Sequence, residues 1–206
     1  EELAVVLERF GGSLVTEPFV PTVVLVAGLL QSRGSVEQQQ QWLPLIANGS
    51  VRAALAHGER QARDALNWVT TTAVQTHGGW QLDGTKMVVL GGDVADLFLV
   101  SARTGGQAGD RDGISLFAVP REQVAANVRN YTLYDGSGAC ELVLDGLILP
   151  ADALVGAQSD AIDAIETAYD SGAAAIAVQA VGAMKRLRDL TLDYIKTRRQ
   201  FGQPLG

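Results

Sequence analysis

The sequence has 206 residues, of which 47% are hydrophobic, and its formal net charge is −7. That length and apolar content are enough for a substantial core in one or two domains, and the acidic balance argues against a nucleic-acid-binding protein. No run approaches the roughly 20 apolar residues of a membrane helix, and the single cysteine, Cys140, has no partner for a disulfide within the chain. We therefore expect a soluble, cytoplasmic protein with no nucleic acid, membrane or metal partner.

Three helical patterns open the chain. Residues 1–10 carry apolar positions at helical spacing, and Gly11-Gly12 is expected to end this helix. Residues 22–33 are almost wholly apolar and predict a helix buried between others. A third helix is expected to begin at Ser35 and to close at Asn48-Gly49. The N-terminal part of the chain is therefore predicted to be helical.

The periodicity changes between Arg52 and Pro150. Short β-branched or alternating segments are separated there by glycine-rich turns, one of them at Asp83-Gly84. This spacing favours an antiparallel sandwich or barrel of about seven strands. The predicted strands cover residues 69–74, 80–82, 87–90, 97–102, 114–119, 128–133 and 139–149.

A long helix follows the strands. Residues 161–199 contain no proline and repeat apolar positions at helical spacing, until Phe201-Gly202 and Pro204 end the pattern. The chain is therefore expected to have an α+β fold in which a central β-domain separates two helical parts. We place the domain boundaries at residues 1–51, 52–156 and 157–206.

The end of this helix carries a family resemblance. Residues 198–205, which read Arg-Arg-Gln-Phe-Gly-Gln-Pro-Leu, resemble the Arg-x-x-Phe-Gly-x-x-Leu signature of the acyl-CoA dehydrogenase family. Four further segments fit the family in the same order: 43–49, 80–87, 144–150 and 180–183. The similarity runs from about Glu37 to Gly206. Because family members continue with further helices after this motif, we expect the chain to be part of a longer polypeptide with an incomplete helical bundle.

The resemblance implies a cofactor contact and a reaction. In the family, the signature arginine reaches the pyrophosphate of an FAD that is bound mainly by a neighbouring subunit. By position, Arg198 would take that role and Gln200 would assist, which suits guanidinium as a permanent, bidentate phosphate binder. From the residues alone, Arg198 is equally well explained as an exposed cation that the helix dipole favours. The implied reaction is FAD-dependent α,β-dehydrogenation of an acyl-CoA thioester of a fatty acid or a steroid side chain.

The same resemblance implies other participants. Electrons would pass to an electron-transfer flavoprotein or to a quinone. The family's catalytic glutamate lies on a helix beyond Gly206, so no catalytic residue is assigned. The family motif Asp-x-x-Arg, which engages acyl-CoA, falls on Asp170 to Ala173. Asp170 is therefore a candidate for binding the substrate, whereas the arginine is missing.

Two stretches of the β-domain depart from the family's flavin site. The family motif Thr-Glu-Pro-x-x-Gly-Ser-Asp falls on residues 58–65, where only Glu59 matches. The aromatic residue, the aliphatic residue and the hydroxyl residue that normally follow Lys-x fall on Val88-Val89-Leu90. Val88 cannot stack on a ring and Leu90 cannot donate a hydrogen bond. For the missing arginine of the Asp-x-x-Arg motif, the alternative explanation is a register error of a residue or two, or substitution by other groups.

The departures lead to three hypotheses. The first is a subunit of a mixed oligomer, in which a related partner holds the flavin and this chain lends Arg198 and Gln200 across the interface. The second is a structural or interaction subunit that binds no flavin. The third is a homo-oligomeric flavoenzyme that binds FAD through an altered loop. Whether the chain is itself an enzyme stays open, with the first hypothesis preferred.

Overall fold

The computed structural model describes residues 2–206, which form two compact units. The larger unit comprises residues 16–172, and the smaller unit combines residues 2–15 with residues 173–206. The long helix α4 (Ile162–Thr197) contributes residues to both units.

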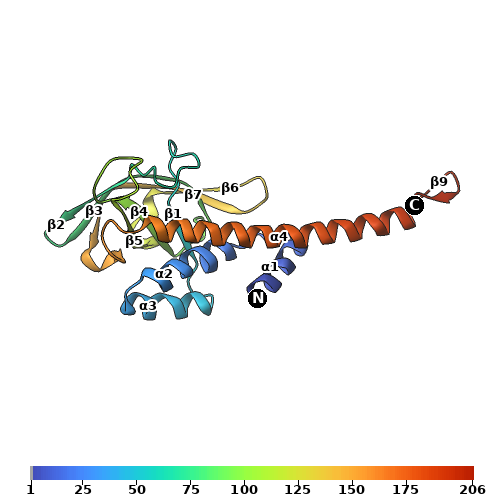
Figure 1. The fold of residues 1–206 in the computed structure, drawn as a ribbon, viewed down its shortest axis with the longest axis horizontal. Coiled ribbons are helices and arrows are strands. Elements are labelled where there is room, and N and C mark those ends of the chain that lie inside the picture. The colour runs from blue at the N-terminus through green and yellow to red at the C-terminus, as the bar shows by residue number, and fades with distance from the viewer. Residues whose placement is uncertain (1) are drawn as a thin grey trace. The chain divides into compact units, whose positions relative to one another are not determined.

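The larger unit begins with three consecutive helical segments (Figure 1). A π-helical segment, η1 (Val20–Val26), runs into α2 (Ala27–Arg33), and α3 (Val36–Ala47) follows. Ser35 starts α3 through a capping box: its hydroxyl accepts from the Gln38 N–H, and the Gln38 side chain accepts from the Ser35 N–H. The predicted helix over residues 22–33 is thus confirmed, with the difference that its first half is π-helical.

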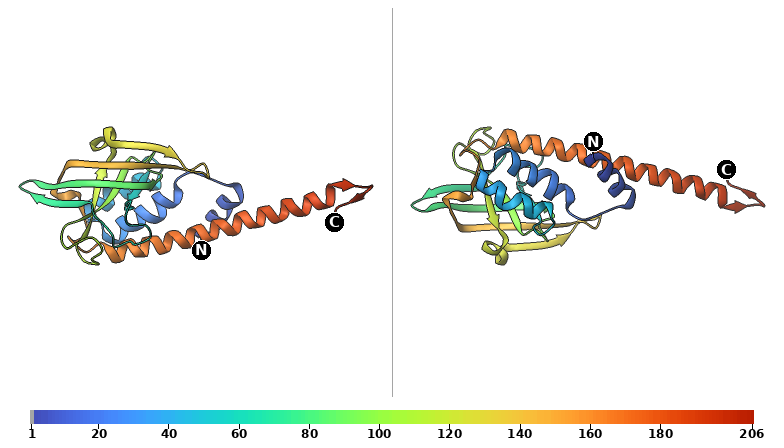
Figure 2. Two further views of the ribbon diagram at one scale, coloured as in Figure 1. Left: turned by 90° about the horizontal axis from the view of Figure 1, so that it is seen from above. Right: turned by 90° about the horizontal axis from the view of Figure 1, so that it is seen from below.

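Eight strands form one sheet in the order β6-β7-β3-β2-β4-β5-β8, with β1 also paired to β4. Helices α2 and α3 lie on one side of this sheet (Figure 2). Short 3-10 turns connect some of the strands: η2 (Arg121–Gln123), η3 (Ala125–Asn127) and η4 (Ala151–Ala153). The strands are β1 (Ala53–Ala56), β2 (Thr72–Thr76), β3 (Gly79–Leu90), β4 (Leu97–Arg103), β5 (Ile114–Pro120), β6 (Val128–Thr132), β7 (Gly138–Pro150) and β8 (Leu154–Val155).

The sheet differs from the predicted strands in three respects. It is mixed, because β1 and β2 both pair with β4 in the parallel direction. Strands β1 and β8 were not predicted. The segments predicted at 80–82 and 87–90 are one strand, β3, and Asp83-Gly84 is not a turn. Instead, the register against β7 shifts at Gly84, and again between Lys86 and Val89.

Strand β4 separates two hydrophobic cores, and all of its residues are buried. Leu97 and Leu99 belong to a core that they share with the helices, including Leu29 and Ile165. Phe98, Val100 and Ala102 belong to a second core between the strands, which also contains Trp80, Phe117 and Leu142. Because side chains alternate along a strand, one strand supplies both cores.

The smaller unit packs α1 (Glu2–Ser13) against α4 at glycines. A methyl group added to Gly11 would overlap the backbone of Gln179, and one added to Gly182 would overlap the Glu8 carbonyl oxygen. Lys185 also pairs with Glu8 at 2.8 Å. The prediction that Gly11-Gly12 ends the first helix is therefore wrong: the helix continues to Ser13, and the glycines serve close helix packing.

The long helix was predicted within two residues at each end. It occupies Ile162–Thr197, and a two-stranded hairpin follows, formed by β9 (Arg199–Gln200) and β10 (Gln203–Pro204). Gly202 at the hairpin tip has φ +82°, a conformation that glycine adopts readily. The α+β fold with N-terminal helices, a β-domain and a long C-terminal helix is thus confirmed.

Candidate functional site

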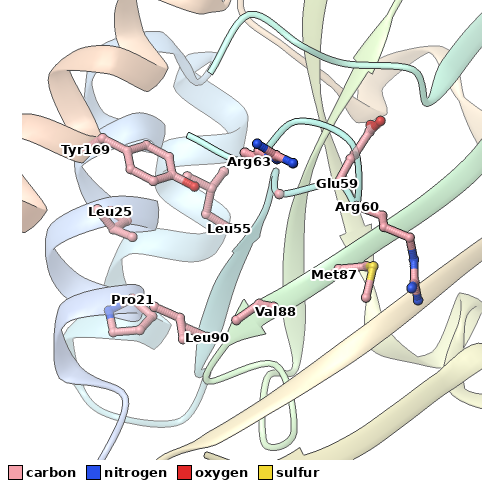
Figure 3. Close-up of a pocket in the computed structure, with 11 residues that line it drawn as sticks. Pro21, Leu25, Leu55, Glu59, Arg60, Arg63, Met87, Val88, Leu90 and Tyr169 are labelled. Atoms are coloured by element: carbon pink, nitrogen blue, oxygen red, sulfur yellow. The ribbon is translucent and has the colours of Figure 1, made fainter. Parts of the chain in front are cut away.

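The two stretches that depart from the family's flavin pattern line a single pocket of the larger unit. The pocket has a volume of about 440 Å³. Its walls come from η1, from β1 and the loop after it, from the register shift in β3, and from α4 (Figure 3). The lining residues are Pro21, Leu25, Leu55, Gly58, Glu59, Arg60, Arg63, Met87, Val88, Leu90 and Tyr169.

A buried ion pair fixes the loop between β1 and β2 onto β3. Lys86 Nζ lies 2.7 Å from Glu59 Oε1, and both side chains are almost completely buried. Lys86 also donates to the His57 carbonyl oxygen and to Ser101 Oγ, at 3.3 and 3.1 Å. Glu59 accepts further hydrogen bonds from the Thr70 hydroxyl and from the N–H groups of Thr70 and Thr71. Every proton of the ammonium group is therefore used within the protein.

The electrostatics of this pair keep it ionised near neutral pH. Burial lowers the pKa of Lys86 to about 8, and the charge of Glu59 opposes part of that shift. Burial would raise the pKa of Glu59, but the charge of Lys86 and the hydrogen bonds from Lys86, Thr70 and Thr71 together lower it to about 2. The pair positions the loop, and both of its charged groups are engaged within the protein.

His57 lies behind the pocket as a neutral, packed side chain. Its Nδ1 is 2.9 Å from Ser101 Oγ. Because the Ser101 oxygen also accepts from Lys86, the Ser101 hydroxyl proton is available to donate to His57 Nδ1. The ring meets Tyr169 edge-on at 5.7 Å. Burial, and then the charge of Lys86, lower the pKa of His57 to about 4.

The pocket itself carries two guanidinium groups. Arg60 and Arg63 are exposed residues of the loop after β1. Within residues 2–206, neither side chain forms a hydrogen bond or an ion pair. Arg63 has φ +48° and Val88 has φ +51°, conformations that non-glycine residues adopt rarely and that are especially unfavourable for a β-branched side chain. The lining thus combines two positively charged side chains with two strained backbone positions.

The lining does not fit a flavin ring held as the family pattern requires. At Gly58 and Leu90, where the pattern has hydroxyl residues, no side chain can donate a hydrogen bond. The Val88 N–H, which faces the same region, already donates to Tyr131 Oη at 3.1 Å. The only carboxylate of the lining, Glu59, is used by Lys86 and the threonines.

The predicted site residues lie in different units. Asp170 belongs to the larger unit, where it is exposed on α4 and does not line the pocket. Arg198 and Gln200 lie together in the smaller unit, where both are exposed. The Arg198 N–H donates to the Tyr194 carbonyl oxygen at 2.8 Å, and Gln200 pairs with Gln203 across the hairpin. The functional roles of these three residues stay predictions.

Comparisons with known proteins identify the family. Residues 54–147 match the model of the acyl-CoA dehydrogenase middle domain, and residues 162–206 match that of the C-terminal domain. The chain belongs to the acyl-CoA dehydrogenase family. It spans about half the length of the curated relatives that it matches.

Three similar proteins illustrate the relationship. An acyl-CoA dehydrogenase of Bacillus subtilis is 32% identical over 177 residues, which cover 84% of this chain and 46% of that protein. The structure of glutaryl-CoA dehydrogenase from Mycobacterium smegmatis is 30% identical, has a TM-score of 0.84, and covers 97% of this chain and 51% of its own. The FAD complex of PigA is 21% identical and, with a TM-score of 0.89, shares the fold over 100% of this chain and 55% of its own.

No helix in residues 2–206 is both long and apolar enough to cross a membrane. In the same residues, no group of three or more histidine, cysteine, aspartate or glutamate side chains is arranged to hold a metal ion.

Proposed function

We propose that this chain is a subunit of an acyl-CoA dehydrogenase assembly in which a related partner chain holds most of the FAD. The assembly would carry out α,β-dehydrogenation of an acyl-CoA thioester. The observation that supports this division of roles is the pocket lining, where Gly58 and Leu90 stand in place of hydroxyl residues. Bound FAD would accept the hydride that leaves the β-carbon of the substrate.

The contribution of this chain would come from its hairpin. The exposed Arg198 side chain forms no hydrogen bond or ion pair within the described chain, so it is free to bind a pyrophosphate. Its backbone is held on both sides, by Tyr194 and by Leu205, which limits the entropy lost when the side chain binds. Gln200 would add a neutral hydrogen bond, and Asp170 would contact the acyl-CoA.

The proposal includes further expectations. The substrate would be a fatty acyl or steroid side-chain thioester, and electrons would leave to an electron-transfer flavoprotein or a quinone. The assembly would work in the cytoplasm. No residue of this chain is assigned as the catalytic base.

The visible absorption spectrum tests the proposal. We expect no flavin bands from the protein purified alone, and flavin bands after co-purification with a related chain. In that complex, Arg198→Ala should weaken flavin retention by about tenfold or more, because it removes a charge-assisted contact. Arg199→Ala is the matched control, since Arg199 is the exposed neighbour in β9 and is outside the family signature position. Flavin content that is unchanged in the Arg198→Ala complex would contradict the proposal.

One observation favours a second candidate function. The unpaired Arg60 and Arg63 provide cations in the loop where family members approach the flavin phosphates. A homo-oligomeric flavoenzyme with an altered loop would use them there. Stoichiometric flavin bands in the protein purified alone would support this alternative, whereas no bands in any complex would support a structural subunit.

A further inference from the structure

The proposed function leaves the pocket of the larger unit without an occupant. Its volume of about 440 Å³ is within the roughly 300–1,000 Å³ typical of small-molecule sites. Its walls come from helical segments and strands and from the loop after β1, which carries Arg60 and Arg63 (Figure 3).

Most of the lining is apolar. Pro21 and Leu25 of η1 and Leu55 of β1 form one side, and Met87, Val88 and Leu90 of β3 form the other. Val88 and Leu90 are 53% and 43% exposed. A ligand with an apolar body would cover them and remove this surface from water.

The charge of the lining is positive and uncompensated. Its one carboxylate, Glu59, is neutralised by Lys86 at 2.7 Å, which leaves Arg60 and Arg63 without a counter-charge. In Figure 3 the Tyr169 ring points toward Leu55 and Arg63. The Tyr169 hydroxyl forms no hydrogen bond in the part of the chain that the structure describes. The guanidinium donates hydrogen bonds and carries a positive charge, and the phenol hydroxyl can donate one more, so an anionic acceptor would pair with both groups.

We propose that this pocket binds an aliphatic carboxylic acid in its ionised form. The carboxylate accepts hydrogen bonds from Arg63 and from the Tyr169 hydroxyl, and the aliphatic tail lies between η1 and the register shift of β3. The isoalloxazine ring of a flavin has no carboxylate for Arg63, and a neutral ester or thioester would supply an acceptor without the charge. The strained backbone at Arg63 and Val88 agrees with a binding role, because strain of this kind concentrates at ligand sites. The inference concerns the larger unit only and does not depend on the role of Arg198.

Calorimetric titration of the purified protein with decanoate tests the inference. We expect saturable binding of decanoate, weaker binding of hexanoate because its tail covers less of the apolar wall, and at least tenfold weaker binding of methyl decanoate. Equal affinity for decanoate and its methyl ester would overturn the inference, as would the absence of decanoate binding. FAD binding that decanoate displaces would also overturn it, because the pocket would then be a flavin site.

Variants locate the carboxylate. Arg63→Gln should weaken decanoate binding about tenfold, because it replaces a charge-assisted contact by a neutral one, and Arg63→Lys should retain an intermediate affinity. Arg129→Gln is the matched control, since its side chain is 83% exposed on β6 and does not line the pocket. Wild-type affinity in Arg63→Gln, with the fold verified by circular dichroism, would contradict the assignment. This test does not measure the flavin content of a complex. A negative result would therefore reject the carboxylate site without bearing on the proposed function.

Discussion

Lys86 is the largest side chain that is completely buried in the larger unit, and its charge is retained there by a single carboxylate. Burying an ion is costly unless a partner and further hydrogen bonds replace its water. Glu59, Ser101 and the His57 carbonyl oxygen supply these contacts. The pair is therefore expected to be sensitive to the loss of either member.

The ion pair gives a prediction for stability. Lys86→Met leaves Glu59 buried without a counter-charge, and we expect it to lower the free energy of unfolding by about 3–5 kcal/mol. The double variant Glu59→Gln with Lys86→Met should lose less than the single one, because no isolated charge remains. Urea denaturation of the single and double variants measures both values. If the free energy of unfolding of the single variant equalled that of the wild type within error, Glu59 would have to become hydrated or protonated at no cost in free energy.

His57 gives a prediction for pH. Its pKa is about 4 in the folded protein and near 6.5 when exposed, so the unfolded chain binds more protons between these values. The free energy of unfolding should therefore fall as the pH drops from 6.5 to 4, by about 3 kcal/mol in all. Below about 4.5, Glu59 adds to the loss, because its pKa is also lowered by folding.

Denaturation at a series of pH values tests this prediction. In His57→Gln the slope between pH 6.5 and pH 4.5 should be much reduced. The exposed His77, the only other histidine, provides the control, and His77→Gln should keep the slope. A slope that survives in His57→Gln and disappears in His77→Gln would refute the assignment.

At the scale of elements, two glycines with opposite surroundings give a matched prediction. Gly182 of α4 lies against the Glu8 carbonyl oxygen, whereas Gly28 of α2 has no neighbour near the position of an added methyl group. Gly182→Ala should destabilise the α1–α4 packing by roughly 1–3 kcal/mol, because a methyl group cannot fit there. Gly28→Ala should stabilise α2 by up to about 1 kcal/mol through helix propensity.

Amide hydrogen exchange distinguishes these effects by location. Gly182→Ala should accelerate exchange in α1, and Gly28→Ala should slow exchange in α2 or leave it unchanged. If Gly182→Ala left protection in α1 unaltered, the helices would have to pack through other residues than the glycines.

The elements also show what a sequence can predict. Alternating or β-branched residues predicted most strands, whereas Ala53–Ala56 was missed because a short run of small apolar residues buried on both faces shows no period. Asp83-Gly84 reads as a turn, yet an added methyl group on Gly84 would contact Thr71, so this glycine allows close approach within a strand. Local pattern alone does not distinguish these two uses of glycine.

The candidate site was predictable only in part. The stretches around Glu59 and Lys86 were expected to lie together, because the resemblance assigns both of them to one flavin site. Their partnership with each other depends on tertiary contacts that spacing does not encode. Tyr169 lines the pocket, whereas the predicted residue Asp170 does not. The two differ because neighbouring positions on a helix point in directions about 100° apart.

At the scale of the whole molecule, the two units differ in how the chain builds them and in how their apolar residues are buried. The larger unit is continuous in sequence and has two cores on the two faces of β4. The smaller unit is built from both ends of the described chain, and α4 exposes Ile176, Met184, Leu187 and Leu190 there. An acyl-CoA dehydrogenase assembly, as proposed above, would bring further chain against such residues.

The contact of Gly11 with Gln179 and of Gly182 with Glu8 also sets an order of events during synthesis. During synthesis α1 leaves the ribosome before the larger unit, but the surface that α1 packs on is completed only after the whole larger unit has been made. The larger unit can fold while the rest of α4 is still being translated, as domains generally do. Until the rest of α4 has been translated, α1 has no surface in this unit to pack on. With 12 residues it is also too short to be stable as an isolated helix in water, so its apolar side chains stay exposed to chaperones during that time.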